Sequence, residues 1–209
     1  GMITKRNKLL VIGLLSILSS TVRTACSSGA KSPRLANDAV ILAFGDSLTF
    51  GTGATPEESY PAVLERLLGR RVVNSGVPGE VTGEGLSRMP EVLEEEKPAL
   101  LILCHGGNDM LRHLDQQQTT GNLRAMIRLA QGRGVAVVII AVPSPGLSLS
   151  PPQFYRETAA EMNIPFDDEA LATVLSDRSL KSDYIHPNAA GYRRLAESIT
   201  ALLKKSGAV

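Results

Sequence analysis

The sequence contains no tryptophan, only two cysteines among its 209 residues, and aromatic residues at 4%. We therefore expect a mainly aliphatic core. Neither a disulfide framework nor a cysteine-based metal site is expected, because Cys26 and Cys104 are too few for either. The chain also has no large excess of either charge, because it contains 22 basic and 21 acidic residues. This balance argues against nucleic acid as a partner. Hydrophobic residues make up 43% of the chain, enough for one folded domain with a sizeable core.

The N-terminus has the pattern of an export signal. Lys5, Arg6 and Lys8 form a basic segment, and residues 9–18 form an apolar run behind it. That run is too short to span a bilayer, which takes roughly 20 apolar residues. We predict that residues 1–30 are an export signal and that residues 36–209 form the folded domain of an exported bacterial protein.

Cys26 offers a second interpretation of the same leader. It precedes Ser27-Ser28-Gly29, which resembles the signal of a bacterial lipoprotein, in which the cysteine is lipidated and becomes the mature N-terminus. Arg23 departs from that signal, since an apolar residue is preferred there. One alternative is a membrane-anchored lipoprotein, in which the residues from Cys26 to about Leu35 form a tether. The other is ordinary cleavage after Ala30, which would leave a periplasmic protein.

Beyond residue 35, short apolar runs alternate with segments of helical periodicity. The runs are continuous rather than alternating in polarity, as expected for strands buried on both faces of a parallel sheet. We expect strands at residues 39–44, 71–74, 99–104, 135–142 and 164–166. We expect helices at residues 60–68, 85–96, 120–133, 153–161 and 188–205. Alternating strands and helices with right-handed crossovers predict an α/β fold, a three-layer α/β/α sandwich around a five-stranded parallel sheet.

Polar residues follow three of these strands directly. Ser47 comes after the first, Gly76 after the second and Asn108 after the third. The carboxyl ends of parallel strands meet at one edge of a sheet, where functional groups gather. Far downstream, Asp183 and His186 lie three residues apart. A serine hydroxyl is a weak nucleophile by itself, and a histidine base oriented by an aspartate is the usual remedy, so the pattern indicates nucleophilic catalysis by serine.

Four segments occur in the order and spacing of the conserved blocks of the SGNH, or GDSL, hydrolase family: Gly45-Asp46-Ser47-Leu48, Gly76, Gly106-Gly107-Asn108-Asp109 and Asp183-x-x-His186. The chain after residue 35 resembles that family along essentially its whole length. Residues 74–82, 85–88 and 185–188 further resemble the bacterial periplasmic thioesterase I, lysophospholipase and arylesterase branch. The resemblance implies a flavodoxin-like α/β/α sandwich and a serine esterase.

The resemblance also implies a role for each residue of the site. Ser47 is the nucleophile, His186 the base that takes its proton, and Asp183 the carboxylate that orients the imidazole. The oxyanion hole is formed by the backbone N–H groups of Ser47 and Gly76 and by the side-chain amide of Asn108. Water completes the reaction, so no cofactor is expected.

Other interpretations of these segments are weaker. Thr49 stands where the Gly-x-Ser-x-Gly motif of α/β-hydrolases has its second glycine, which argues against that fold but not against the chemistry. His105 is an alternative base. It also stands at four-residue spacing with Asp109 and His113, as metal ligands on one helix would. Gly106-Gly107 breaks a helix there, so no metal is expected.

Apolar residues that follow Asn108, or lie in the loop after the fourth predicted strand, suit an acyl chain: Met110, Leu111, Leu147, Leu149 and Phe154. They equally suit simple packing of that loop onto the sheet. By resemblance, the substrate is a small-molecule acyl ester or thioester, including aryl esters and lysophospholipids, and no obligate protein partner is expected. A carbohydrate O-acetylesterase, an acyltransferase and a non-catalytic binding module tethered to the envelope are the alternatives.

Overall fold

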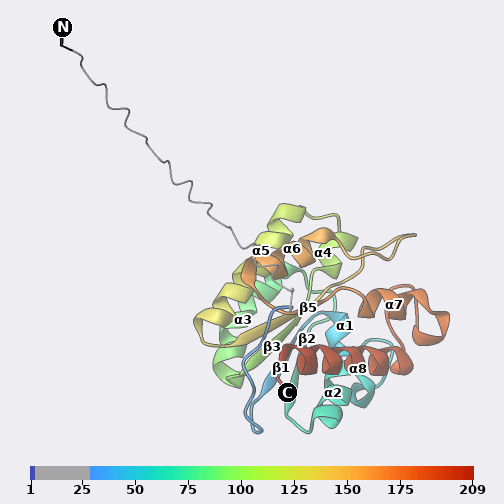
Figure 1. The fold of residues 1–209 in the computed structure, drawn as a ribbon. Helices are drawn as coiled ribbons and strands as arrows, with labels where there is room; N and C mark the ends of the chain where they lie inside the picture. Colours follow the sequence, from blue (N-terminus) through green and yellow to red (C-terminus); the bar gives the residue numbers. More distant parts are fainter. Residues whose placement is uncertain (3–28) are drawn as a thin grey trace.

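The computed structural model describes residues 1–2 and 29–209 (Figure 1). The basic and apolar segments of the predicted export signal, and Cys26, lie outside these residues. From residue 29 onward the chain forms a layered α/β unit in which strands and helices alternate. No helix among the described residues is long and apolar enough to cross a membrane.

Five parallel strands form one sheet in the order β2-β1-β3-β4-β5. They are β1 (Ile41–Gly45), β2 (Val72–Gly76), β3 (Leu100–Cys104), β4 (Ala136–Ile140) and β5 (Phe166–Asp167). The chain first moves outward from β1 to β2 and then returns past β1 to β3, so the strand order reverses at β1. Such a switch point opens a crevice at the carboxyl ends of the strands. The predicted five-stranded parallel sheet is confirmed.

Helices cover both faces of the sheet, which confirms the three-layer sandwich (Figure 1). On one face lie α3 (Thr82–Glu96), α5 (Gln116–Gly132) and α6 (Gln153–Met162). On the other lie α2 (Tyr60–Leu68), α7 (Ala170–Ser176) and α8 (Ala189–Ser206). Two short helices, α1 (Ser47–Phe50) and α4 (Gly107–Leu111), follow β1 and β3, and two 3-10 turns are η1 (Pro56–Glu58) and η2 (Arg178–Leu180).

The elements differ from the sequence prediction in several places, among them the start of α5, which lies at Gln116 instead of residue 120. The prediction missed α1, α4 and α7, because helices of four to seven residues are too short to show a helical period. It started α3 at residue 85 instead of Thr82. The Thr82 N–H and hydroxyl donate to the Asp109 carboxylate at 2.8 and 2.6 Å, and this long-range contact holds the first turn of the helix. β5 is shorter than predicted and comprises two residues.

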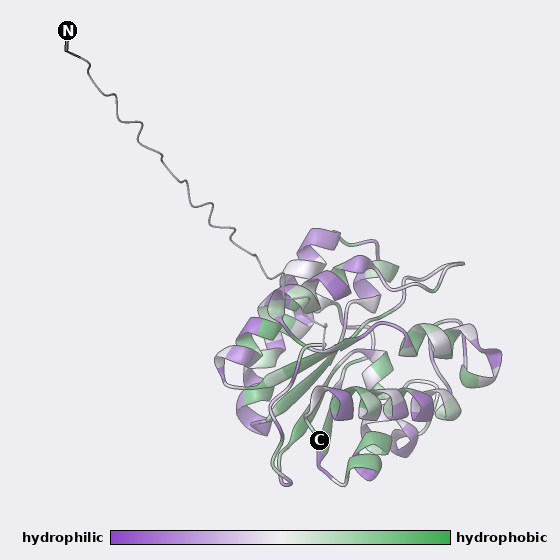
Figure 2. Cartoon of the chain, in the orientation of Figure 1, coloured by the Kyte–Doolittle hydropathy of each residue, from purple (hydrophilic) through white to green (hydrophobic). Residues whose placement is uncertain are grey.

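The core is mainly aliphatic and centred on the middle strands. Every residue of β1 and β3 is buried, and Figure 2 shows mainly hydrophobic residues along the sheet, whereas the surrounding helices alternate between hydrophobic and hydrophilic residues. α8 adds a stripe of fully buried side chains, Tyr192, Leu195, Ile199 and Leu203. Each large apolar side chain buried in this way contributes about 1.5–3 kcal/mol, so the sheet forms a rigid platform for the loops at its edge.

The segment before β1 belongs to the folded unit. The Ser32 N–H donates to the Ser206 carbonyl at 2.9 Å, and the Leu35 N–H donates to the Ala208 carbonyl at 2.8 Å. The Leu35 side chain is buried in the core. The expectation that the chain up to about Leu35 is a tether is therefore wrong for residues 32–35, because these backbone bonds fasten them to the end of α8.

Candidate active site

Ser47 lies at the turn between β1 and α1. Gly45 ends the strand, and a Cβ atom there would lie 2.2 Å from the Cys104 carbonyl oxygen, so the close approach of β3 requires glycine. Asp46 then caps α1: its Oδ1 accepts a hydrogen bond from the Leu48 N–H at 2.9 Å. This turn places Ser47 at the first position of α1, at the carboxyl edge of the sheet. The Ser47 N–H donates to no acceptor among the described residues.

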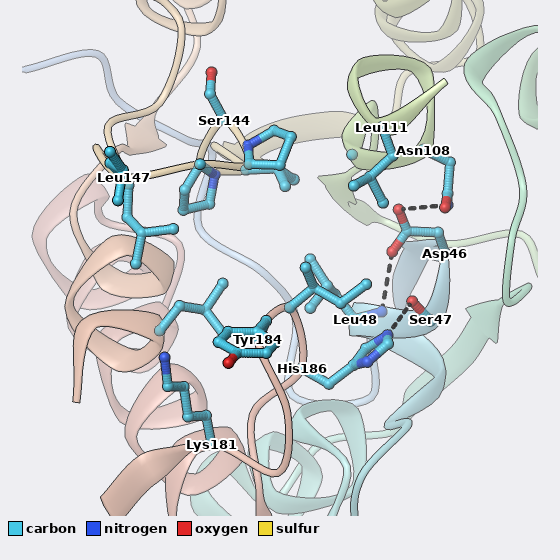
Figure 3. Close-up of a pocket in the computed structure, with 18 residues that line it drawn as sticks. Asp46, Ser47, Leu48, Asn108, Leu111, Ser144, Leu147, Lys181, Tyr184 and His186 are labelled. Atoms are coloured by element: carbon cyan, nitrogen blue, oxygen red, sulfur yellow. Dashed lines mark hydrogen bonds between the residues drawn. The ribbon is translucent and has the colours of Figure 1, made fainter. Parts of the chain in front are cut away.

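Ser47, His186 and Asp183 form a continuous hydrogen-bonded chain. The Ser47 Oγ and the His186 Nε2 are 2.9 Å apart, although 139 residues separate them in the sequence (Figure 3). On the other side of the imidazole, the His186 Nδ1 lies 2.8 Å from Asp183 Oδ2. The structure thus brings together the three residues to which the sequence assigns nucleophile, base and orienting carboxylate.

Asp183 also shapes the loop that carries the histidine. Its Oδ1 accepts hydrogen bonds from the backbone N–H groups of Ile185 and His186, both at 2.8 Å. Partial burial opposes ionisation, but the hydrogen bonds from the His186 ring and these two amides outweigh it and hold the pKa of Asp183 below its usual value. An ionised Asp183 keeps a proton on the His186 Nδ1. The Nε2 that faces Ser47 is therefore free to accept a proton.

Asn108, the second residue of α4, faces the same turn from the end of β3. Its Nδ2 donates to Asp46 Oδ2 at 3.2 Å and to the Glu80 carbonyl at 3.0 Å. Both amide hydrogens are therefore engaged when no substrate is present. Asp46 itself is only 2% exposed, and burial raises the pKa of its carboxyl group.

The backbone amide of Gly76 is engaged within the protein, contrary to the role that the family resemblance implies. Its N–H donates to the Asn74 side-chain oxygen at 3.0 Å, so it does not offer a free donor. A Cβ atom on Gly76 would lie 2.1 Å from the Phe50 nitrogen. Glycine is needed there because α1 packs against the end of β2. The assignment of Gly76 to the oxyanion hole is contradicted by this arrangement.

The turn that follows β2 supplies another glycine. Val77-Pro78-Gly79-Glu80 closes with a hydrogen bond from the Glu80 N–H to the Val77 carbonyl at 3.2 Å, and Gly79 has φ +80°. Proline second and glycine third in a turn of four are typical of type II. The Gly79 N–H donates to no atom of residues 29–209 in the structure. The Pro-Gly pair was visible in the sequence, but the orientation of its amide was not.

A cleft of about 450 Å³ opens beside Ser47 and His186. Its walls are mainly apolar, and its apolar lining includes Leu48, Leu111, Val142, Leu147, Leu149, Leu175, Tyr184 and Ile185. Figure 3 shows Leu147, Lys181 and Tyr184 on the side of the cleft away from Asp46 and Asn108. The sequence predicted Leu111, Leu147 and Leu149, and it missed the side chains that flank the histidine loop.

Met110 and Phe154 do not line this cleft. They line a neighbouring hollow together with Pro152, and the Met110 sulfur accepts a hydrogen bond from the Ser144 hydroxyl at 3.7 Å. Phe154 is 4% exposed and packs on Tyr155 with ring centroids 4.4 Å apart. For these two residues the structure favours packing over contact with an acyl chain.

His105 is not placed to act as a base. Its ring is fully buried: Nδ1 accepts a hydrogen bond from the Gly106 N–H at 3.0 Å, and Nε2 lies 2.9 Å from Glu80 Oε1. An accepting Nδ1 puts the proton on Nε2, where it is donated to Glu80. None of these hydrogen bonds involves Ser47. The Asp109 carboxylate accepts hydrogen bonds from the Thr82 N–H and hydroxyl.

The fold and the site together define an α/β protein with a hydrogen-bonded serine, histidine and aspartate at the carboxyl edge of its sheet, an arrangement suited to hydrolysis. A model of the GDSL-like lipase/acylhydrolase family matches residues 43–194. The chain therefore belongs to that family, as the four sequence blocks indicated.

The known proteins to which this chain is similar include proteins named as esterases and thioesterases. Esterase TesA of Pseudomonas aeruginosa is 32% identical over 182 residues, which cover 78% of this chain and 87% of that protein. The Escherichia coli K12 thioesterase 1/protease 1/lysophospholipase L1 is 27% identical over 71% of this chain and 75% of its own length. A crystal structure of TesA matches with a TM-score of 0.71 at 29% identity, covering 79% of this chain and 98% of that one. The protein is an ester-hydrolysing enzyme.

Proposed function

We propose that the protein hydrolyses carboxylic esters or thioesters through a covalent acyl-enzyme on Ser47. The observation that carries this proposal is the hydrogen-bonded chain from Ser47 through His186 to Asp183, with distances of 2.9 and 2.8 Å, at the mouth of an apolar cleft. The names of the similar proteins, which include an esterase and a thioesterase, support the same reaction class.

The geometry supports a two-step reaction. Ser47 Oγ attacks the acyl carbon while His186 Nε2 takes the hydroxyl proton, and a tetrahedral oxyanion forms. Collapse of that intermediate breaks the bond to the leaving oxygen or sulfur, which receives the proton from His186. A water molecule then attacks the acyl-enzyme, gives its proton to His186, and releases the acid and the serine hydroxyl. Asp183 stays ionised and stabilises the imidazolium in both steps.

We assign the oxyanion to a hole made by three donors. The Ser47 N–H has no acceptor within residues 29–209. The Asn108 amide donates to Asp46 at 3.2 Å, the longer of its two hydrogen bonds and the easier to exchange for an oxyanion. In place of Gly76, we propose the N–H of Gly79, because it has no acceptor in the described part of the chain and directly precedes Glu80, whose carbonyl accepts the Asn108 amide. Each such donor typically contributes about 2.7–4 kcal/mol to the transition state.

The cleft supports an acyl substrate of short to medium length. A volume of about 450 Å³ falls in the range of small-molecule sites. Its apolar walls favour hydrocarbon over a sugar, which would need more polar groups to satisfy its hydroxyls. Acyl esters, aryl esters, acyl thioesters and lysophospholipids all present such a chain.

Hydrolysis of a p-nitrophenyl ester series from acetate to palmitate tests this function. We expect a maximum at medium chains, and we expect Ser47→Ala to abolish turnover while Ser87→Ala, on the exposed side of α3, does not. A maximum at acetate alone would favour the carbohydrate O-acetylesterase. Product analysis with added alcohol separates an acyltransferase, and no turnover on any ester would favour the binding module.

We also propose that the protein is exported, on the basis of the basic and apolar segments at its N-terminus. A lipid at Cys26 would add a membrane anchor with a tether that ends before residue 32. Growth of cells with a radioactive fatty acid tests the anchor: label on the wild type and none on Cys26→Ala is the expected result. Equal label on both, or none on the wild type, contradicts it.

A further inference from the structure

Glu80 is a carboxylate buried beneath the site, and it takes no part in the reaction described above. It is 5% exposed, and both of its oxygens are used. Oε2 accepts from Arg88 Nε at 2.7 Å, while Oε1 accepts from Arg88 Nη2 at 3.0 Å and from His105 Nε2 at 2.9 Å. Burial alone would favour the neutral acid, but the hydrogen bonds from His105 and Arg88 outweigh it and keep the pKa of Glu80 below its usual value.

Arg88 connects this carboxylate to the strands that carry the site. Its guanidinium donates to the Ser75 carbonyl at 2.8 Å and to the Ser75 hydroxyl at 2.6 Å, at the end of β2. It also lies 3.4 Å from the Gly45 carbonyl, two residues before Ser47, and stacks 3.9 Å from the centre of the Phe44 ring. One planar group thus fixes the ends of β1 and β2 relative to Glu80.

His105 connects the same carboxylate to the end of β3. It immediately precedes Gly106-Gly107-Asn108, and its Nδ1 accepts the Gly106 N–H at 3.0 Å. Its carbonyl accepts the Tyr155 hydroxyl at 2.7 Å. In the imidazole ring, Nδ1 is therefore the acceptor and Nε2 is the donor. Through this ring, the Glu80 carboxylate sets the orientation of the segment that leads into Asn108.

The backbone of Glu80 reaches the site directly. Its N–H closes the turn that contains Gly79, and its carbonyl accepts the Asn108 amide at 3.0 Å. The side chain and the main chain of one residue therefore hold two of the three donors that we assign to the oxyanion hole.

We propose that Glu80, clamped by Arg88 and His105, is a positioning residue that sets the Gly79 amide and the Asn108 side chain for the oxyanion. This inference rests on the proposed function of the site. Donors that are fixed before the reaction stabilise the transition state without reorganisation. The cluster consequently acts on the transition state rather than on the substrate, and its loss lowers kcat while KM changes little.

Glu80→Gln is the first test. The substituted side chain keeps one acceptor oxygen, but its NH₂ group faces the N–H donors of Arg88 or His105 and cannot bond to them. We expect kcat on p-nitrophenyl butyrate to fall about ten- to a hundredfold, as misplacement of about 1 Å does. KM should change little, and inhibition by a butyl trifluoromethyl ketone should weaken by the same factor as kcat. Ser47 adds to that ketone to form a tetrahedral oxyanion, so the inhibitor reports on the hole.

A pair of His105 variants separates positioning from other roles. His105→Gln keeps an N–H donor for Glu80 and should retain about tenfold more kcat than His105→Leu, which removes it. Both should keep the wild-type pH profile, because His186 is the base. Ile199→Val, in the buried stripe of α8, is the control for a small loss of stability without change at the site.

Three results would overturn the inference. One is a kcat for Glu80→Gln equal to the kcat of Ile199→Val when the same fraction of each variant is folded. The second is a rise in KM with unchanged kcat, which would place Glu80 in substrate binding. The third is equal loss in both His105 variants with a shifted pH profile. If Glu80→Gln fails to fold, the comparison of His105→Gln with His105→Leu tests the inference by itself. The proposed function is judged separately, by wild type against Ser47→Ala.

Discussion

Replacing Asp183 by asparagine should disable the histidine without disturbing its loop. In the protein, Asp183 Oδ1 holds the Ile185 and His186 amides, and Oδ2 faces the His186 Nδ1 at 2.8 Å. Asparagine can keep an oxygen toward the two amides, which then places its NH₂ group against Nδ1. Because an NH₂ group can only donate, the imidazole must carry its proton on Nε2 instead. That nitrogen would then donate to Ser47 and could no longer accept its proton.

The size of the effect follows from this change of tautomer. The equivalent loss in serine proteases is about ten-thousandfold in kcat, which corresponds to about 5 kcal/mol of transition-state stabilisation. The free energy of unfolding of Asp183→Asn should fall by no more than about 1 kcal/mol, since both loop amides keep their acceptor. Asp183→Ala should lose similar activity and more stability, because it removes the acceptor of those two amides.

Steady-state turnover of p-nitrophenyl butyrate measures kcat, and urea unfolding of the same variants measures the free energy of unfolding. Asp177→Asn is the matched control, since Asp177 caps η2 in the same part of the chain and has no contact with His186. A kcat for Asp183→Asn within tenfold of the wild type would refute the argument, because it would show that the orienting carboxylate does not set the tautomer.

Three further predictions concern the hole, the response to acid and the cleft. Asn108→Ala should lower kcat about a hundredfold or more at nearly constant KM, and an unchanged kcat in steady-state assays would remove Asn108 from the hole. The free energy of unfolding should fall as the pH drops below about 5. Asp183 and Glu80 have depressed pKa values in the folded protein, so their stabilisation is present above the unfolded values of about 3.9 and 4.3 and is lost as pH falls through the folded ones. Urea titrations from pH 7 to pH 3 measure this, and a protein that grows more stable toward pH 3 would contradict it. Leu149→Trp should narrow the cleft and move the best ester to a shorter chain, while Met110→Leu, outside the cleft, should leave the chain-length profile unchanged. Identical profiles for the two variants would show that the acyl chain binds elsewhere.

Much of the fold was predictable because it depends on local composition. The runs in β1 and β3 are continuously apolar, and this pattern fits strands covered on both faces. Short elements were not predictable in the same way. α1 exists because Asp46 caps it and because β1 ends at Gly45, and four residues carry no periodic signal.

The side chains of the site were more predictable than its backbone donors. A serine, a histidine and an aspartate are recognised by residue type and order, and the structure brings Ser47, His186 and Asp183 into contact. Whether a glycine N–H is free depends on the direction of one peptide bond. Gly76 follows the expected strand, yet its N–H donates to the Asn74 side chain, whereas the N–H of Gly79 finds no acceptor among the residues that the structure describes.

The strand–helix order, the mainly aliphatic core and the residue types of the reaction could be predicted from the sequence, because each of them is expressed in composition, periodicity and motif. Three features required the folded structure: which backbone amides lack an acceptor among the described residues, which apolar residues line the cleft, and the hydrogen bonds that connect Glu80 to the ends of three strands. These depend on distances between segments remote in the chain, such as the 25 residues between Glu80 and His105. They are settled only when the sheet brings those segments to one edge.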